Sequence, residues 1–126
     1  MLLRLLSLCA AAPIVLATNL FVASYAGNIT TLSLTEHNGT YTLATVAENN
    51  GCAPNPSWLT QDPSRRTLYC LDEGLDVLNG TLSSFTIARN GSLSLVEKQE
   101  TIKGPVSGAI YGGYTATGGR AIALAH

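Results

Sequence analysis

The sequence has few charged residues and few aromatic ones. Of its 126 residues, 12% are Asp, Glu, Lys or Arg and 6% are Phe, Trp or Tyr. Because 46% are hydrophobic, the composition excludes a disordered polyampholyte and predicts a buried core. The chain has 7 Lys and Arg and 8 Asp and Glu, and Arg65-Arg66 is the only adjacent basic pair. This scatter excludes the basic patch of a nucleic-acid-binding protein, so we expect no nucleic-acid partner.

The sequence also lacks an apolar run long enough to cross a bilayer, which takes about 20 residues. A shorter apolar run extends from Leu5 to Ala17, behind a positively charged start at Arg4. Small residues near Ala17 fit a signal peptidase site, so the sequence predicts a signal peptide over residues 1–17 and a mature chain over 18–126. A buried N-terminal strand or helix is the alternative. We expect a secreted, extracellular protein with no membrane attachment after cleavage.

Cysteine is scarce, with 3 residues in the chain. Cys9 lies in the predicted leader, so the mature chain keeps Cys52 and Cys70. In an oxidising compartment these two thiols can form a disulfide, which the loop-entropy argument values at about 3 kcal/mol. Two free thiols in neighbouring strands are the alternative. Neither a His nor a further Cys lies at metal-ligand spacing, so we predict the disulfide and no metal site.

Four glycosylation sequons agree with export. They begin at Asn28, Asn38, Asn79 and Asn90. We expect N-linked glycans at these residues of an exported chain. Three of the four are also Asn-Gly turn dipeptides, so turn formation is the alternative reason for their presence.

The chain after residue 18 shows no helical apolar period, whereas short apolar or alternating runs recur between turn residues. We expect strands over residues 20–25, 29–35, 41–46, 57–61, 67–71, 82–88, 92–99, 105–111 and 121–125. Asn-Gly dipeptides supply the positive φ values of tight hairpins, so we predict turns at Asn38-Gly39 and Asn90-Gly91. The sequence therefore predicts an all-β protein of antiparallel strands.

An internal repeat organises these strands. Residues 38–43 align with residues 90–95, which lie 52 positions later, and the strands 20–25, 67–72 and 121–126 also align. A unit of about 50 residues with four short strands is the size of a β-propeller blade. Two unrelated hairpins of similar composition are the alternative. The repeat predicts about two four-stranded antiparallel blades in an unclosed propeller fragment, with the first blade lacking its inner strand.

The segment from Asn55 to Tyr69 resembles the inner strand, turn and second strand of the seven-bladed lactonase propellers. That family includes the propeller type of 6-phosphogluconolactonase and the fungal carboxy-cis,cis-muconate cyclases. Residues 82–87, 90–93 and 104–108 are similar to its next elements. The resemblance implies an N-terminal piece of such a propeller. The complete protein would be a monomer that acts on a small-molecule lactone or carboxylate, with catalytic His, Glu and Arg residues supplied mainly by blades beyond position 126.

Few residues in the chain itself are candidates for chemistry. Asp72 and Glu73, with Asp76 nearby, follow a strand where propellers expose loops around the central channel, and could bind a cation or act as a general base. A solvated loop carboxylate is the alternative for each. His126 aligns with Asp72 and Tyr25 in the repeat and could lie at the channel mouth. We keep His126, Asp72 and Glu73 as catalytic candidates.

Other prominent residues have structural explanations. Asp62 before Pro63 fits the start of a sharp turn whose amides the Asp side chain caps. Trp58 fits a core position between adjacent blades, and His37 precedes a hairpin turn at the surface. The sequence holds no Gly-rich phosphate loop and no nucleophile elbow, so we expect no cofactor.

Two functions remain open from the sequence. One is a relative of the lactonases or muconate-lactonising enzymes, of which this chain is a truncated form. The other is a secreted propeller without catalytic activity, whose loops bind a partner. One fold hosts many functions, so the fold alone does not choose between them.

Overall fold

The computed structural model describes residues 16–111 and 121–125. The strands are β1 Leu16–Ala23, β2 Ile29–His37, β3 Thr40–Asn49, β4 Pro56–Asp62, β5 Thr67–Asp72, β6 Thr81–Ile87, β7 Leu93–Glu100, β8 Ser107–Tyr111 and β9 Ala121–Ala125. Within these residues the chain forms no helix, and hence none with the length and apolar character to cross a membrane. The all-β prediction is confirmed.

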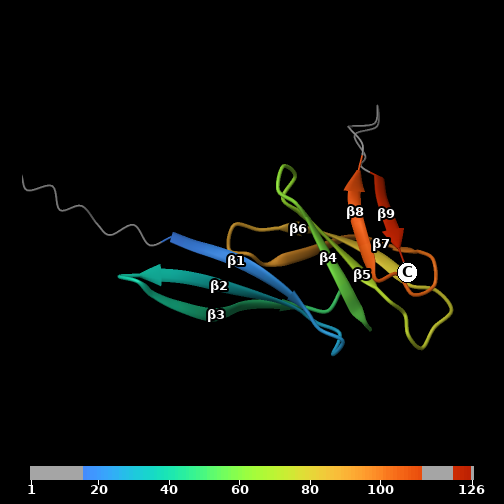
Figure 1. The fold of residues 1–126 in the computed structure, drawn as a ribbon, viewed down its shortest axis with the longest axis horizontal. Coiled ribbons are helices and arrows are strands. Elements are labelled where there is room, and N and C mark those ends of the chain that lie inside the picture. The colour runs from blue at the N-terminus through green and yellow to red at the C-terminus, as the bar shows by residue number, and fades with distance from the viewer. Residues whose placement is uncertain (1–15, 112–120, 126) are drawn as a thin grey trace, which may run out of the picture.

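The strands form three antiparallel sheets that follow one another along the chain (Figure 1). The first has the order β1-β2-β3, the second β4-β5-β6-β7, and the third β8-β9. Strand β4 contacts both β1 and β8, so the leading strands of the three sheets are neighbours. The second sheet is a complete four-stranded blade, and the first has one strand fewer, as the phase of the repeat predicts. The sheets do not close into a ring.

The first strand differs from its predicted bounds, because β1 runs from Leu16 to Ala23 and not over 20–25. A tight turn ends it, in which Gly27 N–H donates to the Ser24 carbonyl at 2.9 Å. Gly27 has φ 97°, which favours glycine. Tyr25 therefore lies in the loop after the strand. Strand β3 is longer than predicted and extends to Asn49.

Both predicted Asn-Gly turns are confirmed, with different geometries. Asn38 and Gly39 both have positive φ, 52° and 77°, as a two-residue hairpin turn requires. In the second turn Gly91 has φ 85°, and the Ala88 N–H donates to the Ser92 carbonyl at 2.9 Å. There the Asn90 side chain accepts a hydrogen bond from the Ser92 N–H at 3.1 Å. The hairpins between β2 and β3 and between β6 and β7 are thereby fixed.

The core lies between the first two sheets. Its buried members are Ile29, Cys52, Leu68, Cys70, Phe85, Ile87 and Leu93, with Phe21 and Leu59 packed against them. Two polar bonds cross the same interface: Thr31 Oγ1 donates to the Gly91 carbonyl at 2.9 Å, and Asn49 Nδ2 donates to the Leu93 carbonyl at 3.0 Å. Apolar packing and paired polar groups together hold the second sheet against the first.

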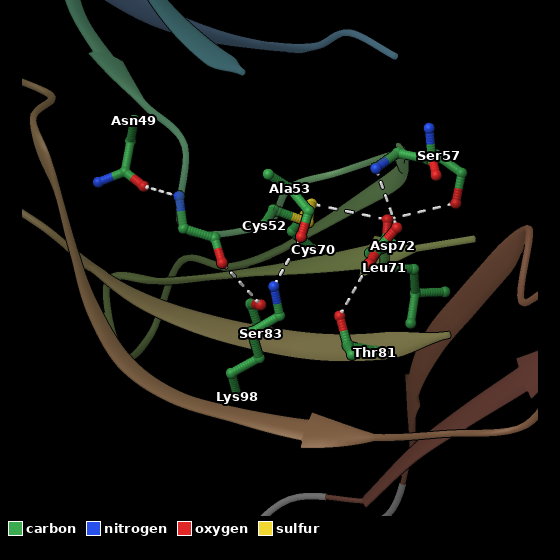
Figure 2. Close-up of a disulfide and its surroundings, with 12 residues drawn as sticks. Asn49, Cys52, Ala53, Ser57, Cys70, Leu71, Asp72, Thr81, Ser83 and Lys98 are labelled. Atoms are coloured by element: carbon green, nitrogen blue, oxygen red, sulfur yellow. Dashed lines mark hydrogen bonds between the residues drawn. A yellow bond between two sulfur atoms is a disulfide. The ribbon is translucent and has the colours of Figure 1, made fainter. Parts of the chain in front are cut away.

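The predicted disulfide between Cys52 and Cys70 is confirmed (Figure 2). The two Cα atoms are 6.1 Å apart and both side chains are 0% exposed. The bond ties the loop before β4 to strand β5. Ser83 Oγ donates to the Gly51 carbonyl at 3.3 Å, and Lys98 Nζ donates to the Ala53 carbonyl at 2.7 Å, so the same loop is also anchored on β6 and β7.

The two faces of the first sheet have different neighbours. Phe21 packs against the core, whereas Leu20 and Val22 point to the other face and are 39% and 47% exposed. Residues of β1 and β5 correspond in the repeat when both face the preceding sheet. Leu68 of β5 faces the preceding sheet, whereas Phe21 faces the following one. The counterpart of Leu68 in β1 is therefore Leu20 and not Phe21. The predicted alignment of these strands is therefore wrong by one residue. Side chains alternate between faces, and a one-residue slip exchanges the faces.

Side chains of β4 bond the second sheet to the third. Trp58 Nε1 and Thr60 Oγ1 both donate to the Gly108 carbonyl of β8, each at 2.9 Å. Trp58 therefore lies between adjacent sheets, as predicted, but it is 43% exposed and is not the core residue that the sequence suggested. Asp62 caps its turn as predicted, because its Oδ1 accepts hydrogen bonds from the Ser64 N–H at 3.1 Å and the Ser64 hydroxyl at 2.6 Å.

Removal of the disulfide tests the anchoring of the loop before β4. We expect the double substitution Cys52→Ala and Cys70→Ala to lower the free energy of unfolding by about 3 kcal/mol, because the unfolded chain gains loop entropy. Urea denaturation of the 126-residue chain measures the change. The wild-type chain treated with a reductant is the control and should unfold near the midpoint of the variant. Equal midpoints for the oxidised wild type and the variant would contradict the stabilising role.

Two glycines provide a matched test of the inter-sheet contact. Gly39 and Gly91 both have positive φ, but a Cβ at Gly39 meets nothing within 4 Å, whereas one at Gly91 lies 2.8 Å from Asn19 and from Thr31. Gly39→Ala should cost about 1–2 kcal/mol from backbone strain alone. Gly91→Ala should cost about 1–3 kcal/mol more, because the added methyl overpacks the interface. Urea denaturation of both variants measures this, and equal losses would show that Gly91 makes no essential contact.

Candidate functional site

The loops of the sheets gather at two opposite ends. Because the strands are antiparallel and consecutive, residues 24–28, 50–55, 73–80 and 101–106 connect strands at one end, which we name the loop end. The short turns at residues 38–39, 63–66 and 88–92 lie at the opposite end, the turn end. Longer connections offer more variable side chains than tight turns, so the loop end is the candidate for binding and chemistry.

Asp72 is the organising residue of the loop end (Figure 2). Its Oδ1 accepts hydrogen bonds from the Asn55 N–H and the Gly74 N–H, both at 3.0 Å, and its Oδ2 accepts one from the Thr81 hydroxyl at 3.3 Å. We expected a carboxylate in an exposed loop, but Asp72 is the last residue of β5 and is 2% exposed. Its hydrogen bonds fix two loops at this end, the one before β4 and the one between β5 and β6.

The neighbouring Glu73 joins two sheets. The Tyr25 hydroxyl, from the loop between β1 and β2, donates to Glu73 Oε2 at 2.5 Å. This hydrogen bond is the main reason that the pKa of Tyr25 is raised above its ordinary value; partial burial and the negative charge of Glu73 add to it. The phenol is therefore protonated at neutral pH and remains a donor. Tyr25 is 58% exposed and Glu73 is half-buried, so a solute can reach this pair.

The loop between β5 and β6 continues from Glu73 with apolar residues. Leu75, Val77 and Leu78 are 59%, 54% and 80% exposed, and Asp76 among them is also exposed. The loop keeps its shape because the Val77 N–H donates to the Gly74 carbonyl at 3.2 Å. Beside the Tyr25–Glu73 pair, this loop therefore presents the Asp76 carboxylate among exposed apolar side chains.

The remaining candidates do not join this group. His37 ends β2 at the turn end and is exposed, as expected of a surface residue. His126 lies outside the described residues, as do residues 1–15 of the predicted signal peptide, whereas Leu16 and Ala17 begin β1. No cluster of His, Cys, Asp and Glu that could hold a metal ion occurs within residues 16–111 and 121–125.

A hollow of about 550 Å³ lies on the outer face of the second sheet. Its lining comes from β5, β6 and β7, from Arg65 in the turn before β5 and from Ile122 of β9. This face is the one turned away from the core, toward the third sheet. The hollow is therefore a space between consecutive sheets, and its side chains belong to a packing surface.

The sequence analysis missed the pairing of Tyr25 with Glu73. Part of its signal was present, because the repeat places Tyr25 and Glu73 after equivalent strands, at the same end of their sheets. What the sequence does not contain is the distance between the ends of two sheets. That distance depends on how the sheets pack, so the contact appears only in the structure.

Comparison with known proteins agrees with this architecture. The model of the lactonase family, described as a seven-bladed β-propeller, matches residues 19–126. Searches among curated proteins and among solved structures found no match. The family match covers both hairpins, the disulfide and the loop end. The chain therefore belongs to the lactonase family of seven-bladed β-propellers.

Proposed function

We propose that residues 18–126 form the first blades of a secreted lactonase propeller that hydrolyses a hydroxylated lactone. The observation that carries this proposal is the family match over residues 19–126. In the reaction, water adds to the lactone carbonyl carbon, the ring C–O bond breaks, and the ring oxygen takes up a proton. The product is a hydroxy acid. The resemblance to 6-phosphogluconolactonase points to a sugar lactone.

The complete site requires more blades than the described residues provide. A ring of seven four-stranded blades has about 28 strands, whereas residues 16–111 and 121–125 form 9. The resemblance implies that further blades supply the catalytic His, Glu and Arg. On this proposal the 126 residues alone are inactive, because the groups that converge on the substrate are not together.

Within this chain we assign Glu73 to substrate binding and Asp72 to the scaffold. Asp72 is buried and its Oδ1 already accepts two backbone hydrogen bonds. Glu73 is half-buried and its Oε2 is held by Tyr25, which leaves Oε1 to accept a hydroxyl of the substrate. A carboxylate here attracts hydroxyl donors and repels a dicarboxylate. This favours a hydroxylated lactone over a muconate as substrate.

The disulfide supports the proposed secretion. Such bonds persist in oxidising compartments and are rare in the cytosol. The Cys52–Cys70 bond lies in the core, where both sulfurs are shielded from solvent. An N-terminal apolar run behind Arg4 has the pattern of an export leader.

A non-catalytic binding propeller is the second candidate. The observation that favours it is the apolar loop of Leu75, Val77 and Leu78, whose exposed side chains resemble a contact surface more than a polar sugar site. In that case the loop end would bind a partner without turning it over.

Steady-state kinetics on a chain that carries all seven blades tests the assignment. Glu73→Gln should raise KM for a sugar lactone about tenfold, the equivalent of one hydrogen bond, and leave kcat unchanged. Asp76→Asn, in the same loop, is the matched control and should change neither value. The 126-residue chain should show no turnover.

Four outcomes would contradict parts of this account. An unchanged KM in Glu73→Gln would remove Glu73 from substrate binding, and a large fall in kcat would make it part of the chemistry. Specific turnover by the 126-residue chain would refute the need for further blades. The absence of lactone hydrolysis in the seven-bladed chain would favour the binding propeller.

A further inference from the structure

The four sequons divide equally between the two ends of the sheets. Asn38 and Asn90 lie in hairpin turns at the turn end. Asn28 and Asn79 lie in the connections at the loop end, on the side of Tyr25 and Glu73. A glycan is larger than the loops that carry it, so a chain with a glycosylated Asn folds properly only if there is free space around that Asn in the folded protein.

At the turn end both Asn side chains are open to solvent. Asn38 is exposed, and a Cβ added to the adjacent Gly39 would meet nothing within 4 Å. Figure 1 shows this hairpin, between β2 and β3, projecting away from the second sheet. Asn90 is also exposed, and its Oδ1 accepts hydrogen bonds from the N–H and the hydroxyl of Ser92. A Cβ at the adjacent Gly91 would lie 2.8 Å from Asn19 and from Thr31, but Asn90 itself is exposed, so its side chain has room for a glycan.

Asn79 lies in a crowded loop. It is half-buried, and a Cβ at the adjacent Gly80 would clash with the Pro105 ring and the Asp72 carbonyl oxygen. The hydroxyl of Thr81, the third residue of this sequon, donates to Asp72 Oδ2 at 3.3 Å. The sequon is therefore built into the same hydrogen-bond network that fixes the loop end.

Asn28 is half-buried as well. It lines a shallow hollow with Glu48, Asn49 and Asn50, and it immediately precedes Ile29, a core residue that is 0% exposed. Its carbonyl oxygen accepts a hydrogen bond from the Ser24 N–H at 2.9 Å, so its backbone is fixed. Because Asn28 is half-buried on a fixed backbone, we expect a sugar chain here to disturb the connection between β1 and β2.

We propose that the secreted protein carries N-linked glycans on Asn38 and Asn90 and none on Asn28 and Asn79. This inference rests on the proposed secretion. In the reaction, Asn Nδ2 bonds to the anomeric carbon of an oligosaccharide carried on a lipid pyrophosphate. The bond from that carbon to the pyrophosphate oxygen breaks, the lipid pyrophosphate leaves, and Nδ2 loses one proton. A chain modified at Asn28 or Asn79 would fold poorly and be retained in the cell.

The proposed pattern has a consequence for the candidate site. Glycans on Asn38 and Asn90 cover the turn end only. The loop end, with Tyr25 and Glu73, stays free of sugar and open to a solute.

Site occupancy can be measured on the full 126-residue chain secreted by a eukaryotic host. Two forms are made, one with its own leader and one in which a known secretory leader replaces residues 1–17. Secreted protein is deglycosylated enzymatically in heavy-oxygen water, which converts each modified Asn to a labelled Asp, and peptides are read by mass spectrometry. We expect label at residues 38 and 90 and unmodified Asn at residues 28 and 79.

Matched variants give an independent reading. Asn38→Gln and Asn90→Gln should each remove one glycan from the intact mass, and the double variant should carry none. Asn28→Gln and Asn79→Gln should leave the glycan number unchanged. Label at residue 28 or 79, or its absence at 38 or 90, would overturn the inference in either form of the chain. Failure of the native leader alone to direct export would refute the proposed secretion, while the other form still reports the occupancy.

Discussion

The burial of apolar side chains between the first two sheets is the interaction on which the rest of the structure depends. A single sheet has two faces, and both faces of the second sheet carry large side chains. Ile29, Leu68 and Phe85 are at most 1% exposed at this interface, and each such side chain contributes about 1.5–3 kcal/mol when fully buried. The disulfide and the polar bonds to Gly91 and Leu93 then fix the register of one sheet on the other. Because the sheets are fixed in this way, Tyr25 of one meets Glu73 of the next.

The same packing rule explains the surfaces that the described sheets leave open. The outward face of the first sheet presents Leu20, Val22, Tyr41 and Leu43, which are 39–69% exposed. Leu20 is the counterpart of Leu68, which is buried in the second sheet. The hollow on the outer face of the second sheet lies where the next sheet packs. A propeller repeats one interface from blade to blade, so each sheet has the surface for two neighbours.

Features encoded in a few adjacent residues could be predicted from the sequence. Local chemistry predicts the Asn-Gly turns, the capped turn at Asp62 and the all-β class. The repeat predicts how the strands divide into sheets and that the first sheet lacks one strand. The disulfide also followed, because the mature chain has two cysteines. Trp58 could be placed between blades because a large aromatic residue in an apolar strand usually packs against a neighbour, but its 43% exposure could not be predicted.

Features that depend on the meeting of distant segments could not be predicted in the same way. Asp72 was expected in an exposed loop, since nothing in its neighbourhood shows that the Asn55 and Gly74 amides and the Thr81 hydroxyl converge on it. The alignment of β1 with β5 was wrong by one residue, because similar apolar runs fit in either phase until the facing sheet is known. The Tyr25–Glu73 contact joins residues 48 positions apart and belongs to the same class.

Hydrogen exchange tests the central proposal, that the first sheet is a propeller blade whose inner strand is supplied by the complete ring. The amides of β5 and β6, which pair on both sides within the second sheet, should exchange slowly in the 126-residue chain. Those amides of β1 that point away from β2 should exchange rapidly in this chain and become protected in a chain with all seven blades. Equal exchange of these β1 amides in the two chains would contradict the account.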